Sequence, residues 1–120
     1  YYFANLMKSK KPEDMEVVSK LTLVFPNQGN RGTHINLSAG GVAKHSPNKE
    51  AAIRFLEYLV SPQAQKYFAE GNNEYPVVAG VALSSQLEAL GTFKEDQLNA
   101  RVFAQNNAEA LKIMDRAGWK

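Results

Sequence analysis

Two adjacent tyrosines, Tyr1 and Tyr2, are the side chains in this sequence whose type and spacing best suit metal chemistry. They open a segment in which Phe3, Leu6 and Met7 are spaced to form one apolar stripe of a short helix. A helix start presents unpaired backbone N–H groups and a partial positive charge, so it favours nearby anions. Phenolate oxygens there are hard donors, which hard and highly charged cations prefer. The alternative is that both tyrosines are half-buried amphipathic aromatics at a helix end.

Sequence patterns of enzymes are not found elsewhere in the chain. His34 and His45 do not form an HxxxH or HExxH pair. Residues 39–41 (Ala-Gly-Gly) lack both the Lys-Ser/Thr of a P-loop and the third glycine of a dinucleotide loop. Ser38 does not lie in a G-x-S-x-G nucleophile elbow. We therefore interpret the protein as non-catalytic and His34 as a hydrogen-bonding residue near a strand.

The composition fits a soluble globular class. With 120 residues, of which 44% are apolar and 22% charged, the chain can form one domain with a core. No apolar run approaches the roughly 18–20 residues of a membrane span. Fourteen basic and twelve acidic residues are mostly interspersed, which does not favour a nucleic-acid surface. Cysteine is absent, which excludes disulfides and thiolate metal sites. Because the first residue is Tyr, we expect a piece of a longer chain.

The elements that must position the tyrosines read as helices with a few strands. Apolar periodicity and end signals predict helices over 1–7, 49–60, 61–71 and 107–117, with shorter turns after Pro12 and around 87–90. In the third helix Ser61 is the expected N-cap, Gln65 has the capping-box position and Gly71 is the expected stop. β-rich or alternating runs predict extended strands over 21–25, 33–43 and 75–78. The predicted fold class is α/β, without the regular alternation of a doubly wound sheet.

Several stretches resemble a known family. The helix ending at Val60, followed by Ser61-Pro62-Gln63-Ala64-Gln65, resembles the C-terminal region of extracellular solute-binding proteins of ABC importers. The ferric-ion-binding proteins of bacterial iron importers are similar over nearly the whole chain. The residues that carry this likeness are Phe25-Pro26-Asn27-Gln28, the run from Gly32 to Val42, Asn73-Glu74-Tyr75-Pro76-Val77 and Asp115-Arg116-Ala117-Gly118-Trp119.

The resemblance implies part of a two-lobed periplasmic-binding-protein (type II) fold, in which mostly helices pack on a few strands. Residues 1–120 would be its C-terminal portion, roughly the last third. They would comprise the Tyr-Tyr helix, hinge or return strands near 20–44, and C-terminal helices. The upstream lobe would be absent. Because that lobe would normally complete part of the core, we expect marginal stability for the chain alone.

The resemblance also implies a site and a function. Tyr1 and Tyr2 stand where the family has a tyrosine pair that supplies two phenolate ligands to Fe(III). The remaining ligands would come largely from the upstream lobe, together with a synergistic anion such as carbonate or phosphate. His34, Glu74 and Tyr75 match family positions that we interpret as structural. The intact protein would bind ferric iron between its lobes as a monomer. It would deliver the ion to the membrane permease of an ABC importer, in the periplasm or tethered outside the cytoplasmic membrane.

Two alternatives stay open at this point. A protein of the same fold could bind another small ligand, such as an organic anion or a polyamine, with Tyr1 and Tyr2 stacking or hydrogen-bonding. A non-catalytic structural or interaction domain would instead bury both tyrosines in its core. Binding that survives strict removal of metal would indicate the first alternative, and inaccessible phenols the second.

Overall fold

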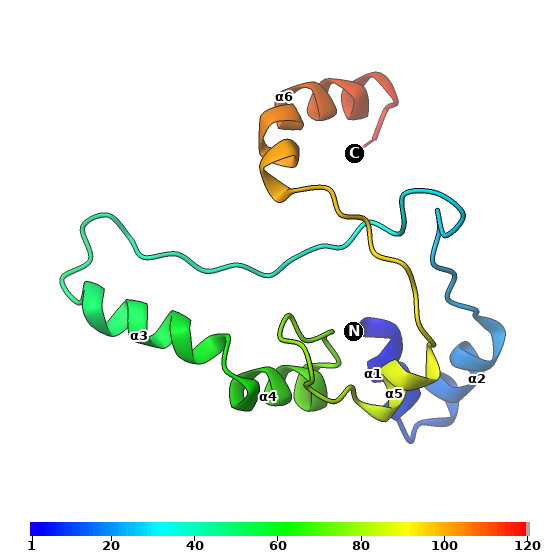
Figure 1. Ribbon diagram of the computed structural model, residues 1–120. Helices are drawn as coiled ribbons and strands as arrows, with labels where there is room; N and C mark the ends of the chain where they lie inside the picture. The colour runs from blue at the N-terminus through cyan, green and yellow to red at the C-terminus, as the bar shows by residue number, and fades with distance from the viewer. Residues whose placement is uncertain (120) are drawn as a thin grey trace. The chain divides into compact units, whose positions relative to one another are not determined.

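The computed structural model describes residues 1–119, and their regular secondary structure consists of six α-helices (Figure 1). The helices are α1 (Tyr2–Lys8), α2 (Pro12–Lys20), α3 (Lys49–Leu59), α4 (Pro62–Asn72), α5 (Ser85–Ala89) and α6 (Ala100–Arg116). Within residues 1–119, none of these helices is both long enough and apolar enough to cross a lipid bilayer.

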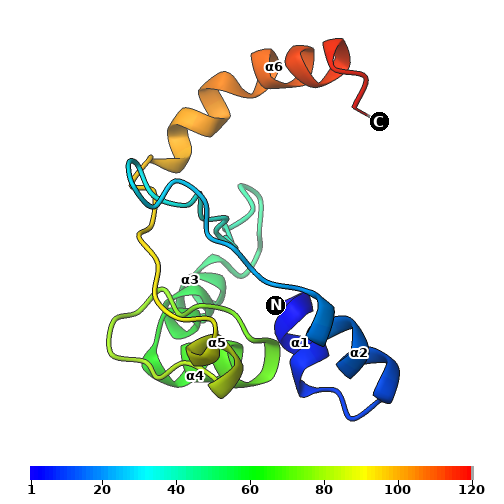
Figure 2. The same cartoon turned by 90° about the vertical axis from the view of Figure 1, so that its right-hand side faces the viewer.

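The chain divides into two compact units. The first comprises Tyr1–Phe25 and Asn36–Thr92 and contains α1 to α5; the second comprises Pro26–Ile35 and Phe93–Lys120 and contains α6. Within the first unit, α1 packs against α2 and α5, and α3 contacts α4. Figure 2 shows α1 beside α2 and α5 from a second direction. The helix that begins with the tyrosines is therefore held on two sides.

The capping residues of α4 explain where this helix begins and ends. Ser61 is the N-cap, as predicted, and its side-chain oxygen accepts a hydrogen bond from the Ala64 N–H at 3.2 Å. The predicted capping-box role of Gln65 is wrong. Its amide donates to the Leu59 carbonyl and accepts from the Val77 N–H, both at 2.8 Å. The predicted stop at residue 71 is also wrong, because the left-handed C-cap is Asn73, with φ 54°.

The predicted strands over 21–25, 33–43 and 75–78 do not form in residues 1–119, so the α/β prediction needs correction. The described part of the chain is helical, and its β pairing is one isolated parallel bridge between Thr33 and Glu95. A helix satisfies its backbone hydrogen bonds within one segment, whereas a strand needs a neighbouring strand. The extended segments have the β-rich composition of strands, but within residues 1–119 they meet no partner along a ladder.

The bridge in the second unit depends on one glutamine side chain and one glycine. The Gln28 side-chain amide donates to the Lys94 carbonyl at 3.0 Å, and its oxygen accepts from the Lys94 N–H at 2.7 Å. The Thr33 N–H also donates to the Lys94 carbonyl, at 2.8 Å. Gly32 has φ 97°, and a Cβ there would lie 2.5 Å from the backbone oxygen of Glu95. Only glycine combines this backbone conformation with such a close approach.

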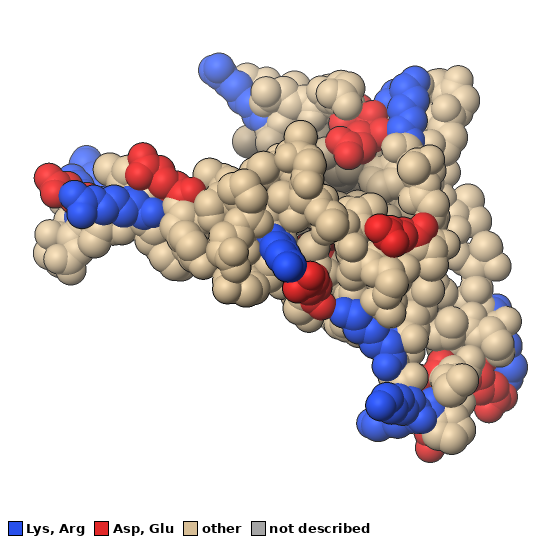
Figure 3. Space-filling model, turned by 60° about the horizontal axis from the view of Figure 1, so that its bottom comes forward, with Lys and Arg blue, Asp and Glu red and all other residues tan. Residues whose placement is uncertain are grey.

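Few side chains are fully buried. The buried apolar residues are Ala4, Ala64, Ala69 and Leu87, all in the first unit. α3 and α6 bury none of their residues. Charged side chains of both signs lie next to one another on the face shown in Figure 3. Exposed ion pairs such as Lys66 with Glu70 contribute only about 0–1 kcal/mol each, so they add little to the stability of the first unit.

Candidate metal-binding site

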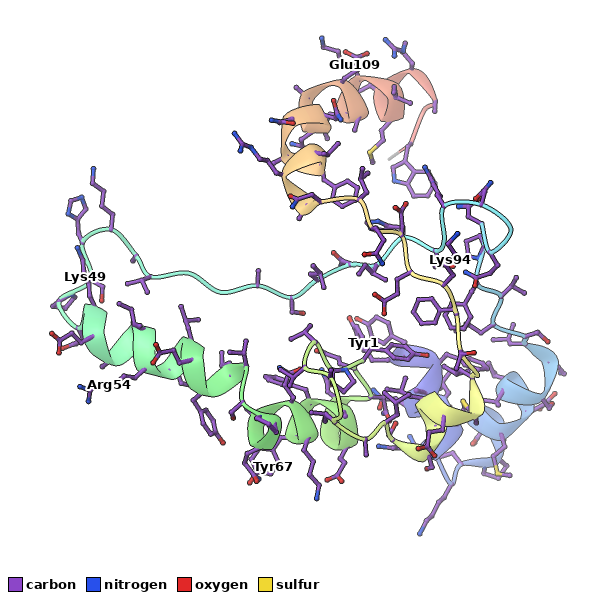
Figure 4. The ribbon with its side chains drawn as sticks, in the orientation of Figure 1. Tyr1, Lys49, Arg54, Tyr67, Lys94 and Glu109 are labelled. Carbon is purple, nitrogen blue, oxygen red and sulfur yellow. The ribbon has the colours of Figure 1, made fainter. Side chains whose placement is uncertain are left out.

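Tyr1 and Tyr2 lie together at the start of α1, where Tyr1 is the N-cap (Figure 4). Their ring centroids are 4.3 Å apart and the ring planes are tilted by 43°. Both side chains are exposed, Tyr1 to 55% and Tyr2 to 76%. The Asn5 N–H donates to the Tyr1 carbonyl at 2.8 Å, which fixes the first turn of the helix. The structure thus places two phenols of the same element side by side and open to a ligand.

The electrostatics of this pair disfavour ionisation when no cation is present. A side-chain hydrogen bond with Tyr2, followed by repulsion from the Tyr2 charge, raises the pKa of Tyr1. Like charges at close range favour the neutral form of one partner. A cation between the two oxygens would reverse this preference, because it attracts both charges and replaces the phenolic protons. The pair is therefore suited to a cation that binds ionised oxygen donors.

Glu74 lies close enough for its charge to affect Tyr1. Its carboxylate is a further, smaller cause that raises the pKa of Tyr1. The Asn72 side-chain amide donates to this carboxylate and holds it beside the end of α4. The family resemblance predicts a structural role for Glu74. Glu74 and Tyr1 are far apart in the sequence, so no local sequence pattern indicates that they lie close together.

The other candidate residues have structural surroundings. His34 in the second unit packs edge-on against Phe103, with ring centroids 5.0 Å apart. Tyr75 is 38% exposed, and partial burial raises the pKa of its phenol. In residues 1–119 no group of three or more His, Cys, Asp or Glu side chains is arranged to hold a metal. The tyrosine pair is therefore the metal-binding candidate of the described chain.

Comparison with known proteins defines the class. Residues 3–95 match the family described as bacterial extracellular solute-binding protein, which is more than half of the chain. The chain belongs to this family. Its members bind solutes and are not enzymes, which confirms the non-catalytic interpretation. The family match begins directly after Tyr2, so it does not include the tyrosine pair.

Two individual relatives are named for iron uptake or for ferric iron binding. Iron uptake protein A2 of Synechocystis sp. is 50% identical over 122 residues, which cover all of this chain and 35% of the relative. The major ferric iron-binding protein of Neisseria meningitidis is 25% identical over 120 residues, again covering all of this chain and 35% of the relative. The chain thus spans about a third of the length of these relatives.

Solved structures show the same relationship. A Trichodesmium protein (IdiA, FutA) in complex with iron and citrate is 61% identical, with a TM-score of 0.93 over all of this chain and 38% of the other. A ferric binding protein from Campylobacter jejuni is 45% identical, with a TM-score of 0.88 and the same coverage. The predicted resemblance to ferric-ion-binding proteins is confirmed, and so is the expectation of part of a periplasmic-binding-protein fold.

Proposed function

We propose that this chain supplies two phenolate ligands, from Tyr1 and Tyr2, to a ferric-ion site. The observation that carries the proposal is the adjacent, exposed pair of phenols with ring centroids 4.3 Å apart. Fe(III) is a hard cation and prefers oxygen donors of this type. It is acidic enough to displace a phenolic proton well below the free tyrosine pKa of about 10. The likeness to iron-uptake and ferric-binding relatives over the whole chain supports this choice of metal.

Two phenolates leave further coordination positions of the ion open. No cluster of carboxylate or imidazole side chains within residues 1–119 is arranged to fill them. We propose that a second lobe of the intact protein and a synergistic anion, such as carbonate or phosphate, provide the remaining donors. The Trichodesmium relative is in complex with iron and citrate, which supports the inclusion of an anion in this proposal.

The proposed protein is a carrier rather than a catalyst. Iron would bind in the cleft between two lobes of a monomer, and a hinge motion would close them over the ion. The closed form would then be recognised by the membrane permease of an ABC importer, which receives the iron. We place the protein in the periplasm or tethered outside the cytoplasmic membrane, in agreement with its extracellular solute-binding family.

The test replaces the phenols while keeping the rings. In the full natural polypeptide that carries this sequence, Tyr1→Phe combined with Tyr2→Phe should abolish the visible phenolate-to-iron absorption. The matched control is Tyr58→Phe combined with Tyr67→Phe, which removes two other exposed phenols, 46% and 59% accessible, and should leave the colour intact. Unchanged absorption in the Tyr1 and Tyr2 double variant would refute the assignment. Ligand binding that persists after strict chelation of metal would instead indicate an organic anion or a polyamine.

A further inference from the structure

Asn73 occupies an unusual position for a polar residue in this chain. It is 1% exposed, and it has the left-handed φ of 54° at the C-cap of α4. Asparagine tolerates this backbone conformation better than most residues other than glycine. A polar side chain that is almost completely buried must find hydrogen-bond partners. Both the nitrogen and the oxygen of the Asn73 carboxamide have hydrogen-bond partners.

The partners of Asn73 belong to two other helices. Its side-chain N–H donates to the side-chain oxygen of Asn5 in α1 at 2.7 Å. Its side-chain oxygen accepts from the Ser84 hydroxyl at 3.0 Å. Ser84 is the N-cap of α5, and its oxygen accepts from the Leu87 N–H at 3.4 Å. One carboxamide therefore connects the end of α4 with α1 and with the start of α5.

Asn5 transmits this contact to the tyrosine pair. It lies one helical turn after Tyr1, so the two residues share a face of α1. Its own N–H donates to the Tyr1 carbonyl at 2.8 Å. A shift of Asn5 relative to α4 would therefore carry the first turn of α1 with it. At the other end of α1, the exposed Lys8 ammonium donates a hydrogen bond to the backbone carbonyl of Glu70 in α4.

We propose that Asn73 is a positioning residue for the metal site, whose carboxamide holds the first turn of α1 in the place that presents Tyr1 and Tyr2 to the ion. The inference rests on the proposed function of the two phenols. Residues that orient metal ligands from outside the coordination sphere typically change metal affinity by about 10- to 100-fold when they are replaced. A residue that only caps α4 would change stability without changing the iron site.

The experiment uses Asn73→Gly in the full natural polypeptide. Glycine keeps the left-handed backbone and removes the side chain together with its carboxamide. The matched control is Asn27→Gly, an exposed asparagine of the second unit with φ 59°. Asn5→Leu removes the side-chain oxygen that accepts from Asn73. The measurements are the wavelength of the phenolate-to-iron absorption and the rate of iron loss to a chelator.

Asn73→Gly and Asn5→Leu should shift the absorption and release iron about tenfold faster or more. Asn27→Gly should behave like the parent protein. A variant that is less stable but has the parent's absorption and release rate would overturn the proposal. A colourless parent would refute phenolate ligation itself. In that case the positioning role of Asn73 is tested by the NMR ring signals of Tyr1 and Tyr2 in metal-free protein. The role requires that Asn73→Gly shifts these signals and that Asn27→Gly does not.

Discussion

Produced on its own, the 120-residue chain should unfold without a sharp cooperative transition. Its accessible surface is 9716 Å². An unfolded chain of 13.3 kDa exposes about 19,000 Å², and a compact monomer of this mass exposes about 6,500 Å². The chain therefore buries about half of its unfolded surface. A compact chain of this size would bury about two-thirds, and even a marginal 60-residue domain buries about 60%.

The residues that are left exposed explain the shortfall. Three of the four fully buried apolar residues are alanines, which contribute little apolar area, and Leu87 is the only large one among them within residues 1–119. The amphipathic helices α3 and α6 bury no residue there. Phe55 in α3 remains 59% exposed and Leu111 in α6 remains 52% exposed. Burial of such side chains is the main favourable contribution to folding, so its absence should leave the folded state marginal.

Differential scanning calorimetry tests this prediction directly. A compact domain of 120 residues would absorb about 80 kcal/mol on unfolding near 60 °C. We expect a broad transition with a clearly smaller enthalpy. The transitions followed by near-UV and by far-UV circular dichroism should also have different midpoints. Coincident midpoints are the mark of two-state unfolding, which we do not expect for this chain. A single sharp transition with an enthalpy near about 80 kcal/mol and coincident spectroscopic changes would refute the reasoning.

Two further predictions concern the second unit and the metal site. Gly32→Ala should destabilise the bridge to Glu95 by about 2 kcal/mol or more, since a Cβ there meets backbone at 2.5 Å and φ is 97°. Faster amide exchange at Thr33 would show this, whereas Gly29→Ala, with open space around its Cβ, should have little effect. Tyr2 raises the pKa of Tyr1, so under the proposed ligation this phenol loses a proton when iron binds. Iron affinity in competition with a chelator should therefore fall at least about tenfold per pH unit as the pH is lowered, and a constant affinity would contradict phenolate ligation.

The sequence predicted the helices much better than the strands, for a physical reason. A helix start such as Ser61 followed by Pro62 is encoded within one turn, and the structure places the N-cap of α4 there. The segment 33–43 has the alternation of a strand, but forming one requires a partner that local sequence does not contain. α6 was predicted from residue 107 and begins at Ala100, because Asn99 caps it and accepts from the Arg101 N–H.

Some features of the candidate site could also be predicted from local sequence, whereas others could not. Tyr1 and Tyr2 could be singled out from the sequence because they are adjacent and open an apolar helix. The proximity of Glu74 and the contact between Asn5 and Asn73 could not, because they join segments about seventy residues apart. Such contacts arise only when the end of α4 meets α1 in the folded chain, and no periodicity or motif in either segment indicates the pairing.

The two proposed donors are adjacent in the sequence, which separates the control of their spacing from the control of their direction. Because Tyr1 and Tyr2 are consecutive residues, the spacing of their oxygens is governed by the backbone at the start of α1 and by the two side-chain torsions of each tyrosine. The direction in which the pair points is governed separately, by the way α1 docks on its neighbours. Donor chemistry and donor orientation can therefore change independently. Substitutions in the docking contacts should alter iron release while both phenolates remain bound, whereas substitution of either tyrosine should remove a donor altogether.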